Sequence, residues 1–304
     1  MPDPIFAWLV SNAAWEGFRR GIDVATKLVA PPKPSANWIA RINNYCEGEL
    51  KVRKLVEHEP KVCIDGAYKF TPEQQAEIKR FRAAIRKKGR PNDPHAIVVG
   101  TPTWESDPVT FHACTLDYAG VKTLRAEGEK PALLSSCVVL VCPQTRQLVL
   151  HRRQEDVATM KGRLHTMGGG YMPPVKGGVD ADRYSLKSTA SREVHEESQL
   201  EISTVTQVPL MLSEELSTGF VQLVFLGMPI TKAALAAMSD NWEGTVAPVG
   251  FDNLLDTFYS ADWAPSGKGH VLSWLAIGAP GAGLRPKFGK YTASDLFDIV
   301  VGEQ

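Results

Sequence analysis

The chain has 304 residues, which suits one large domain or two ordinary ones at about 150 residues each. Hydrophobic residues make up 43% and charged residues 22%, so the composition excludes wholesale disorder and supplies a core that needs no disulfide or metal support. Basic and acidic side chains number 34 each, and a net charge of zero argues against a protein that coats nucleic acid.

The charges are unevenly distributed, and the cysteines are those of a reduced protein. Residues 1–90 carry 17 basic and 10 acidic side chains, a net of +7, so the rest of the chain carries −7. The five cysteines form no Cys-x-x-Cys pair, and an odd number of thiols is typical of a cytosolic protein. No run approaches the roughly 18 apolar residues of a membrane span, and the opening stretch lacks the basic leader of a signal peptide. We therefore expect a cytoplasmic protein with no membrane partner.

The first part of the chain has a helical and basic pattern. Apolar spacing over 5–29 predicts one or two amphipathic helices, which the prolines of 31–34 end. Thr71 and Pro72 are typical of a helix N-terminus, and that helix is predicted to continue to about Lys88. Its last turns hold six basic side chains, Lys79, Arg80, Arg82, Arg86, Lys87 and Lys88. A solvated face is the favoured interpretation of this run, and a phosphate or RNA contact is the alternative.

A change of pattern after the break at 91–94 predicts two regions, an N-terminal helical and basic region over 1–94 and a second domain over 95–304. Short apolar runs in the second region predict strands over 96–99, 109–115, 136–142, 148–151, 164–167, 205–212 and 221–226. Periodic segments predict helices over 185–199, 231–238, 251–259 and 270–277. This mixture of strands and helices predicts an α/β or α+β fold class.

The predicted helix 185–199 concentrates charge in one stretch, Arg192-Glu193-Val194-His195-Glu196-Glu197. Glu193, Glu196 and Glu197 stand at i, i+3 and i+4, so their side chains share one helix face. Like charges repel at this spacing, and a hard divalent cation, which binds carboxylate and phosphate oxygens, would relieve the repulsion. The glycines 168–170 lie upstream, where backbone can approach a phosphate closely. Together these features indicate a metal and phosphate site, and a glutamate-rich surface helix is the structural alternative.

This segment resembles the Nudix box of the Nudix hydrolases, in which a Gly and a Glu precede the motif Arg-Glu-aliphatic-any-Glu-Glu and a Gly and an aliphatic residue follow it. The matching positions are Gly178, Arg192, Glu193, Val194, Glu196, Glu197 and Leu200. Tyr184 stands in place of the first Glu, and Gln199 stands in place of the late Gly. If the glycines 168–170 mark the start of the box, the residues around 173–180 are an insertion before the helix.

The resemblance implies a Nudix fold, a mixed β-sheet sandwiched between helices, with a helical N-terminal extension. It implies a nucleotide pyrophosphatase that hydrolyses a nucleoside diphosphate linked to another moiety, such as a nucleotide sugar or a dinucleotide, with Mg²⁺ or Mn²⁺ as cofactor. Glu193, Glu196 and Glu197 would ligate the metal, and Arg192 would hold the glutamates by ion pairing. Either Glu197 or Glu243, on a downstream loop, would accept a proton from the attacking water. The likeness also implies substrate contacts at the basic strand end and the glycine turn, at Arg152, Arg153, Gly169 and Gly170.

The two departures from the box, Tyr184 and Gln199, leave three interpretations open. In the first, hydrolysis of a small nucleotide derivative survives because the metal-facing glutamates remain, with Asp180 or Asp182 in place of the missing carboxylate. In the second, which ranks below it, an RNA end is the substrate and the basic N-terminal region holds the strand. In the third, the domain is catalytically silent and senses a nucleotide for regulation. A homodimer built through the N-terminal helices is left open, and three scattered histidines are interpreted as surface or structural residues, His151, His165 and His195.

Overall fold

The computed structural model describes residues 37–302 except positions 57, 90–91, 156, 158–159, 174–184, 203–207 and 227–228. The helices predicted over 5–29 and the proline linker lie outside the described residues, as do Gly178, Asp180, Asp182 and Tyr184. Within the described ranges, no helix is both long enough and apolar enough to cross a membrane.

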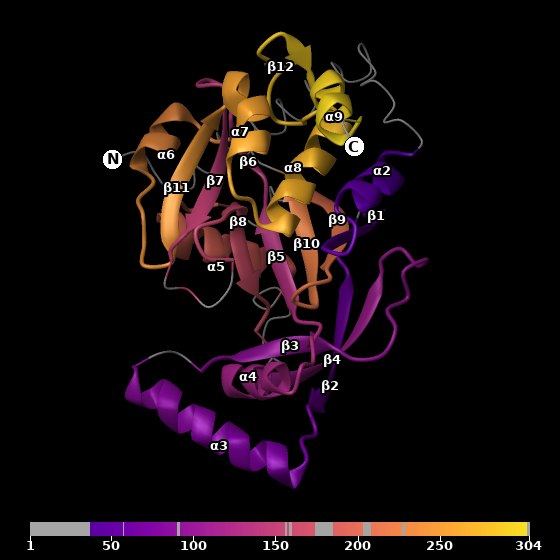
Figure 1. The fold of residues 1–304 in the computed structure, drawn as a ribbon, viewed down its shortest axis with the longest axis vertical. Coiled ribbons are helices and arrows are strands. Elements are labelled where there is room, and N and C mark those ends of the chain that lie inside the picture. Colours follow the sequence, from indigo (N-terminus) through magenta and orange to yellow (C-terminus); the bar gives the residue numbers. More distant parts are fainter. Residues whose placement is uncertain are drawn as a thin grey trace, which may run out of the picture.

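A mixed sheet of eight strands forms the centre of the molecule (Figure 1). In spatial order the strands are β1 (Leu50–Leu55), β9 (Val208–Glu215), β10 (Phe220–Leu226), β5 (Leu134–Val138), β8 (Leu164–Tyr171), β7 (Gln147–Arg153) and β11 (Gly244–Gly250), and β6 (Leu140–Cys142) also pairs with β7. The β10–β5 pair is parallel, and the other pairs are antiparallel. Every residue of β5 and β6 is buried, Ser135 and Ser136 included, as is typical of strands at the centre of a sheet.

The helices lie in two layers, one on each face of this sheet. On one face lies α5 (Leu186–Ser198), whose Leu186, Ala190 and Val194 recur at helical spacing and pack among strand side chains. The other face packs against a second group of helices, α2 (Trp38–Tyr45), α7 (Leu254–Ser260), α8 (Pro265–Ala276) and α9 (Ala293–Gly302). The short α6 (Lys232–Ala237) packs on the α5 side, and a 3-10 turn (Phe251–Asn253) precedes α7. The predicted fold class, a mixed sheet between helices, is confirmed.

A second, smaller sheet lies below the main one in Figure 1, with two helices beside it. It consists of β2 (Lys61–Ala67), β4 (Thr110–Asp117) and β3 (Pro94–Val98), in that order, with α3 (Pro72–Lys87) and α4 (Tyr118–Ala126). The predicted boundary between residues 94 and 95 falls at the start of β3, so one sheet takes strands from both sides of it. A two-stranded hairpin of β12 (Lys287–Phe288) and β13 (Tyr291–Thr292) precedes α9.

Most predicted elements of the described ranges are present, and the differences follow from tertiary context. The predicted strand 136–142 is two strands, because the chain leaves its pairing with β8 and β10 after Val138 and pairs with β7 from Leu140. The predicted strand 164–167 was expected to end in a glycine turn, and this was wrong, since β8 continues through the three glycines to Tyr171. The last predicted helix begins at Pro265 rather than at residue 270. The unpredicted elements are β1, β2, α2, α4, β11, β12, β13 and α9.

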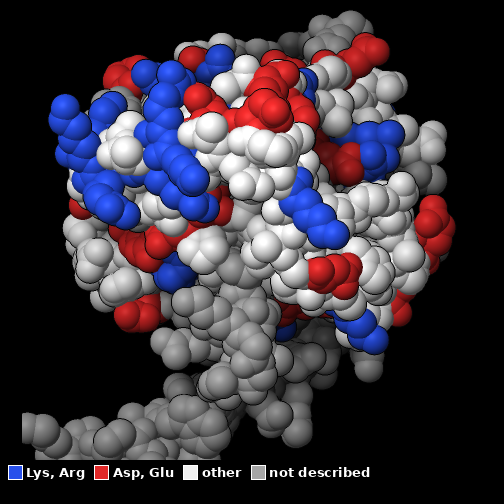
Figure 2. Space-filling model, turned by 90° about the horizontal axis from the view of Figure 1, so that it is seen from below, with Lys and Arg blue, Asp and Glu red and all other residues white. Residues whose placement is uncertain are grey.

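The basic helix α3 lies at the surface. It begins as predicted, with the side chain of Thr71 and that of Gln74 forming a capping box. All six basic side chains of its last turns are exposed, and Figure 2, which views the molecule from below, shows lysines and arginines gathered on one side of that face. Two of them form ion pairs, Arg82 with Asp117 at 2.6 Å and Arg80 with Glu77.

Candidate active site

A cleft of about 630 Å³ lies where the main sheet meets the small sheet and α4. Its volume falls in the range of pockets that take small ligands. Eight of the predicted site residues line this one cleft, Arg153, Gly169, Gly170, Arg192, Glu193, Glu196, Glu197 and Glu243. Arg152 is not among the lining residues that the structure describes, since its guanidinium donates to the carbonyl oxygen of Gly162 at 3.0 Å. The basic side chains of α3 are not among them either.

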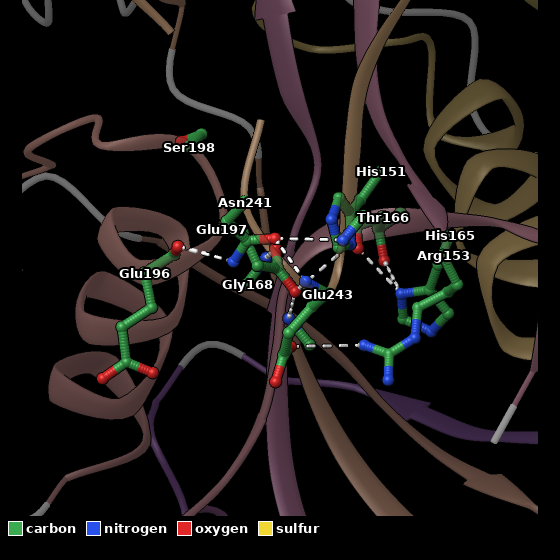
Figure 3. Close-up of polar contacts among 12 residues, drawn as sticks. His151, Arg153, His165, Thr166, Gly168, Glu196, Glu197, Ser198, Asn241 and Glu243 are labelled. Carbon is green, nitrogen blue, oxygen red and sulfur yellow. Dashed lines mark hydrogen bonds and ion pairs between the residues drawn. The ribbon is translucent and has the colours of Figure 1, made fainter. Parts of the chain in front are cut away.

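Glu197 is the most deeply buried carboxylate of the cleft, with 1% of its surface exposed. Its Oε2 accepts the N–H of Gly168 at 2.6 Å, and its Oε1 accepts the N–H of Gly169 at 3.3 Å, so the glycine segment of β8 fixes its orientation (Figure 3). Burial, reinforced by the charge of Glu193, raises the pKa of Glu197 to about 8. This carboxyl therefore exchanges a proton close to neutral pH.

Arg192 lies between the other two glutamates of the helix. Its Nη2 is 2.5 Å from Glu193 Oε1, and its Nη1 is 3.0 Å from Glu196 Oε2. Glu193 is 12% exposed, and burial raises its pKa to about 7 even though Arg192 acts in the opposite direction. Glu196 is half exposed at the mouth of the cleft. Of the three glutamates that the i, i+3, i+4 spacing places on one helix face, Glu193 and Glu197 are therefore buried in the cleft and Glu196 is half exposed at its mouth.

Glu243 reaches the same cleft from the turn before β11. Its carboxylate is 3.6 Å from Nη1 of Arg153 on β7, and burial raises its pKa (Figure 3). Asn241 fixes this turn on α5, because its side-chain amide donates to the carbonyl oxygen of Glu196 at 2.7 Å and its Oδ1 accepts the N–H of Glu243 at 2.9 Å. Both candidates for the proton acceptor, Glu197 and Glu243, thus line one cleft, and the geometry does not decide between them.

The glycines of β8 allow α5 to approach the sheet closely. A Cβ built on Gly170 would lie 1.7 Å from the side-chain Cδ of Glu193, so this carboxylate occupies space that any other residue would fill. Gly168 has a φ of +68°, and a Cβ there would meet Val194 at 2.9 Å and the carbonyl oxygen of Ala190 at 3.1 Å. The glycine segment therefore serves to place the glutamates over the end of β8.

His151 is a site residue that the sequence interpretation missed. Its ring is 1% exposed, lines the cleft, and lies with Nδ1 3.6 Å from Glu197 Oε1. Neither ring nitrogen has a hydrogen-bond partner among the described residues, and burial lowers the pKa of His151 to about 3, which keeps the imidazole neutral. Strand alternation was the available signal, because His151 and Arg153 share one face of β7 while Arg152 points to the other. His165 also lines the cleft and donates to or accepts from Ser266 Oγ at 2.9 Å.

The carboxylates of the cleft do not converge on a common point in this structure. Among the described residues, no three His, Cys, Asp or Glu side chains lie close enough together to hold a metal ion. The oxygen atoms of Glu193, Glu196 and Glu197 are distributed along the cleft wall, with Arg192 paired to two of them.

No protein family model matches the chain, and no curated protein does either. Among solved structures, a MutT protein from Methanosarcina mazei Go1 is 24% identical, with 47% of this chain and 92% of that chain covered and a TM-score of 0.35. The NUDIX domain of Shewanella oneidensis NrtR, complexed with ADP ribose, is 17% identical over 46% of this chain and 84% of that chain, with a TM-score of 0.30. A bifunctional NMN adenylyltransferase/ADP ribose pyrophosphatase from Francisella tularensis, complexed with AMP and a Mn ion, is 11% identical over 49% of this chain and 43% of that chain, with a TM-score of 0.37. The chain is thus similar, at a distance, to solved MutT and NUDIX proteins.

Proposed function

We propose that this chain is a Nudix-type pyrophosphohydrolase, which cleaves the P–O–P linkage of a nucleoside diphosphate joined to another moiety. The observation that carries the proposal is the convergence of four glutamates and two arginines at one end of a cleft of nucleotide size. A purely structural glutamate-rich helix would turn its carboxylates to solvent. Here Glu193 and Glu197 face inward, where burial opposes their ionisation, and such an arrangement is typical of a functional site.

The chemistry of the donors fits a hard divalent cation such as Mg²⁺ or Mn²⁺, and the three carboxylates would have to converge on it from their present positions. All candidate ligands are carboxylate oxygens, and burial and mutual repulsion raise the pKa values of Glu193 and Glu197, so a cation would favour the state in which both are ionised. Glu193, Glu196 and Glu197 would hold the ion. When bound, it would neutralise charge on the phosphoryl oxygens and lower the pKa of a bound water.

The chain's own residues supply the remaining parts of the reaction. Arg153 lines the cleft and would bind the anionic phosphates, and Arg192 holds Glu193 and Glu196 by ion pairing. A water oxygen bonds to phosphorus as the bridging P–O bond breaks, the water proton passes to a carboxylate, and the second phosphate leaves with the bond electrons. Glu197 or Glu243 accepts that proton, and the amides of Gly168 and Gly169 keep Glu197 pointing into the cleft while it does so.

The test is hydrolysis of a panel of nucleotide sugars, dinucleotides, nucleoside triphosphates and capped RNA, with Mg²⁺ and with Mn²⁺. Wild type is measured beside Glu197→Gln. Metal-dependent turnover that the substitution removes supports the proposal and identifies the substrate class. Turnover that the substitution leaves unchanged contradicts the roles given to Glu197.

A catalytically silent nucleotide sensor is the second candidate. It is favoured by the ion pairs of Arg192, which occupy Glu193 and Glu196, and by Tyr184 in place of the glutamate of the box. Calorimetry on the same panel separates the two candidates. Nucleotide binding by folded wild type without turnover of any panel member would establish the sensor.

A further inference from the structure

The end of the cleft away from the glutamates is built from four separate elements. Gln222 on β10, Ser135 on β5 and Tyr171 on β8 are direct partners across adjacent strands, so their side chains lie in one row on the same face of the sheet. Phe220 lies on that same face, two residues before Gln222 on β10. Arg125 of α4 reaches over this row from the small sheet, with its guanidinium 5.2 Å from the centre of the Phe220 ring. All five line the cleft.

Two polar atoms at this end have no hydrogen-bond partner in the part of the chain that the structure describes. Gln222 is 3% exposed, and its Oε1 accepts no hydrogen bond. The charge of Arg125 acts on the Tyr171 hydroxyl, and its buried Nη2 has no acceptor among the described residues. A buried polar atom without a partner costs free energy, and the two atoms do not satisfy each other although they line one cavity. An acceptor and a donor of residues that line the cleft therefore have their hydrogen-bonding capacity unused.

The surroundings of these two atoms are aromatic. The Tyr171 ring packs edge to face on Phe220 with centroids 5.1 Å apart, and on His95 of β3 at the same distance. Burial lowers the pKa of His95 to about 4, so its ring is neutral and acts as a wall rather than a cation. Two carboxylates line this end among the described residues: Asp93, which lies beside His95, and Glu215, which is already engaged by Thr218 Oγ1 at 2.8 Å and by Ser266. Rings and a guanidinium plane favour a flat aromatic ligand over a hydroxyl-rich sugar.

We propose that this end of the cleft is a nucleobase subsite, where Gln222 Oε1 accepts a hydrogen bond from a base N–H and Arg125 Nη2 donates one to a neighbouring acceptor on the same base edge. Each nucleobase carries such a donor and acceptor side by side. The inference rests on the proposed function, which places the phosphates at the glutamate end. Gln222 and Arg125 then determine which base is held while the linkage is cleaved at the other end.

The experiment measures binding by calorimetry of AMP, GMP, CMP, UMP and ribose 5-phosphate, none of which contains a cleavable P–O–P linkage. Wild type is expected to bind one of the four nucleotides about tenfold or more tightly than ribose 5-phosphate. Gln222→Leu should lower the affinity for that nucleotide about tenfold and leave ribose 5-phosphate unchanged. Gln144→Leu, a glutamine outside the cleft, is the matched control and should change neither.

Arg125→Met gives a second, independent variant, so the test does not depend on the folding of Gln222→Leu. It should reduce base discrimination, whereas Arg146→Met should not, because the guanidinium of Arg146 lies over Phe251, outside the cleft. Equal binding of all five ligands, or a uniform loss in the variants, overturns the subsite even if pyrophosphate hydrolysis is found. Base-selective binding that Gln222→Leu removes upholds the subsite even if hydrolysis is absent.

Discussion

The two ends of the cleft are built in opposite ways. The glutamate end comes from one turn of α5, the glycine segment of β8 and the neighbouring strand β7, so most of its residues lie within one stretch of the chain. The opposite end joins Arg125, Ser135, Tyr171 and Gln222, which meet only because β10, β5 and β8 are neighbours in the sheet. A fixed helical spacing reveals the first end in the sequence. The second end depends on strand order, which no local pattern encodes.

Glu197→Gln is the change with the largest expected effect at the glutamate end. It keeps the size of the side chain and removes the proton-accepting charge, so we expect metal-dependent turnover to fall by about 10²–10⁴-fold. Thermal unfolding should show an intact fold, because burial already opposes the charge of this carboxyl. Glu201→Gln is the matched control, since that glutamate is exposed, pairs with His195 and lies outside the cleft. Equal losses in both variants would contradict a special role of Glu197.

Gly170→Ala tests whether the glycines of β8 serve the glutamates. The new methyl would overlap the Glu193 carboxylate, so we expect overpacking to cost about 1–3 kcal/mol of unfolding free energy and turnover to fall sharply. Gly302→Ala is the control, because a Cβ at that position meets no atom within 4 Å. Chemical denaturation and steady-state kinetics on both variants provide the comparison. Wild-type turnover in Gly170→Ala would show that the position of Glu193 is immaterial.

The pH dependence of stability gives a third, smaller effect. Burial raises the pKa values of Glu193 and Glu197 to about 7 and about 8, from an ordinary 4.5. Between pH 5 and 8 the folded protein holds protons on these two carboxyls that the unfolded chain releases, so their contribution to the free energy of unfolding should fall as pH rises. Buried histidines such as His95 and His151, whose pKa values are lowered to about 4 and about 3, act in the opposite direction below about pH 7. The fall is therefore measured as the stability of metal-free wild type relative to Glu197→Gln.

A divalent cation competes with those protons. Added Mg²⁺ or Mn²⁺ should therefore raise the melting temperature more at pH 8 than at pH 6, and Glu197→Gln should reduce this difference. Melting curves with EDTA, with Mg²⁺ and with Mn²⁺ provide the measurement. If metal-free wild type lost no stability relative to Glu197→Gln between pH 5 and 8, burial would not destabilise the charged form of Glu197.

The same contrast explains how far the fold was predictable. The apolar spacing of Leu186, Ala190 and Val194 predicted α5 to within a residue or two, because that face packs on the sheet as amphipathic helices do. The edge strand β1 was not predicted, although Leu50 and Val52 alternate with charged residues. Such a short alternation does not identify a strand by itself, and β1 is stabilised by its pairing with β9, which lies far away in the sequence. The sequence indicated that another group approaches the glycines of β8 closely. In the structure that group is the side chain of Glu193, and its identity depends on how α5 packs on the sheet, which the sequence pattern does not specify.

The smallest expected effect concerns the basic helix α3, which belongs to neither end of the cleft. Replacing Lys79, Arg86 and Lys87 by Gln removes three exposed charges from a helix that packs on α4 through Ile78 and Ile85. Since these side chains do not line the cleft, turnover of a small nucleotide substrate and its dependence on salt should stay unchanged. Binding of capped RNA by wild type and by the triple variant, measured at several salt concentrations, distinguishes a small nucleotide substrate from an RNA substrate. If RNA binding weakens in this triple variant and loses part of its salt dependence, α3 holds a strand whose end reaches the glutamates, and the substrate of this cleft is longer than a nucleotide.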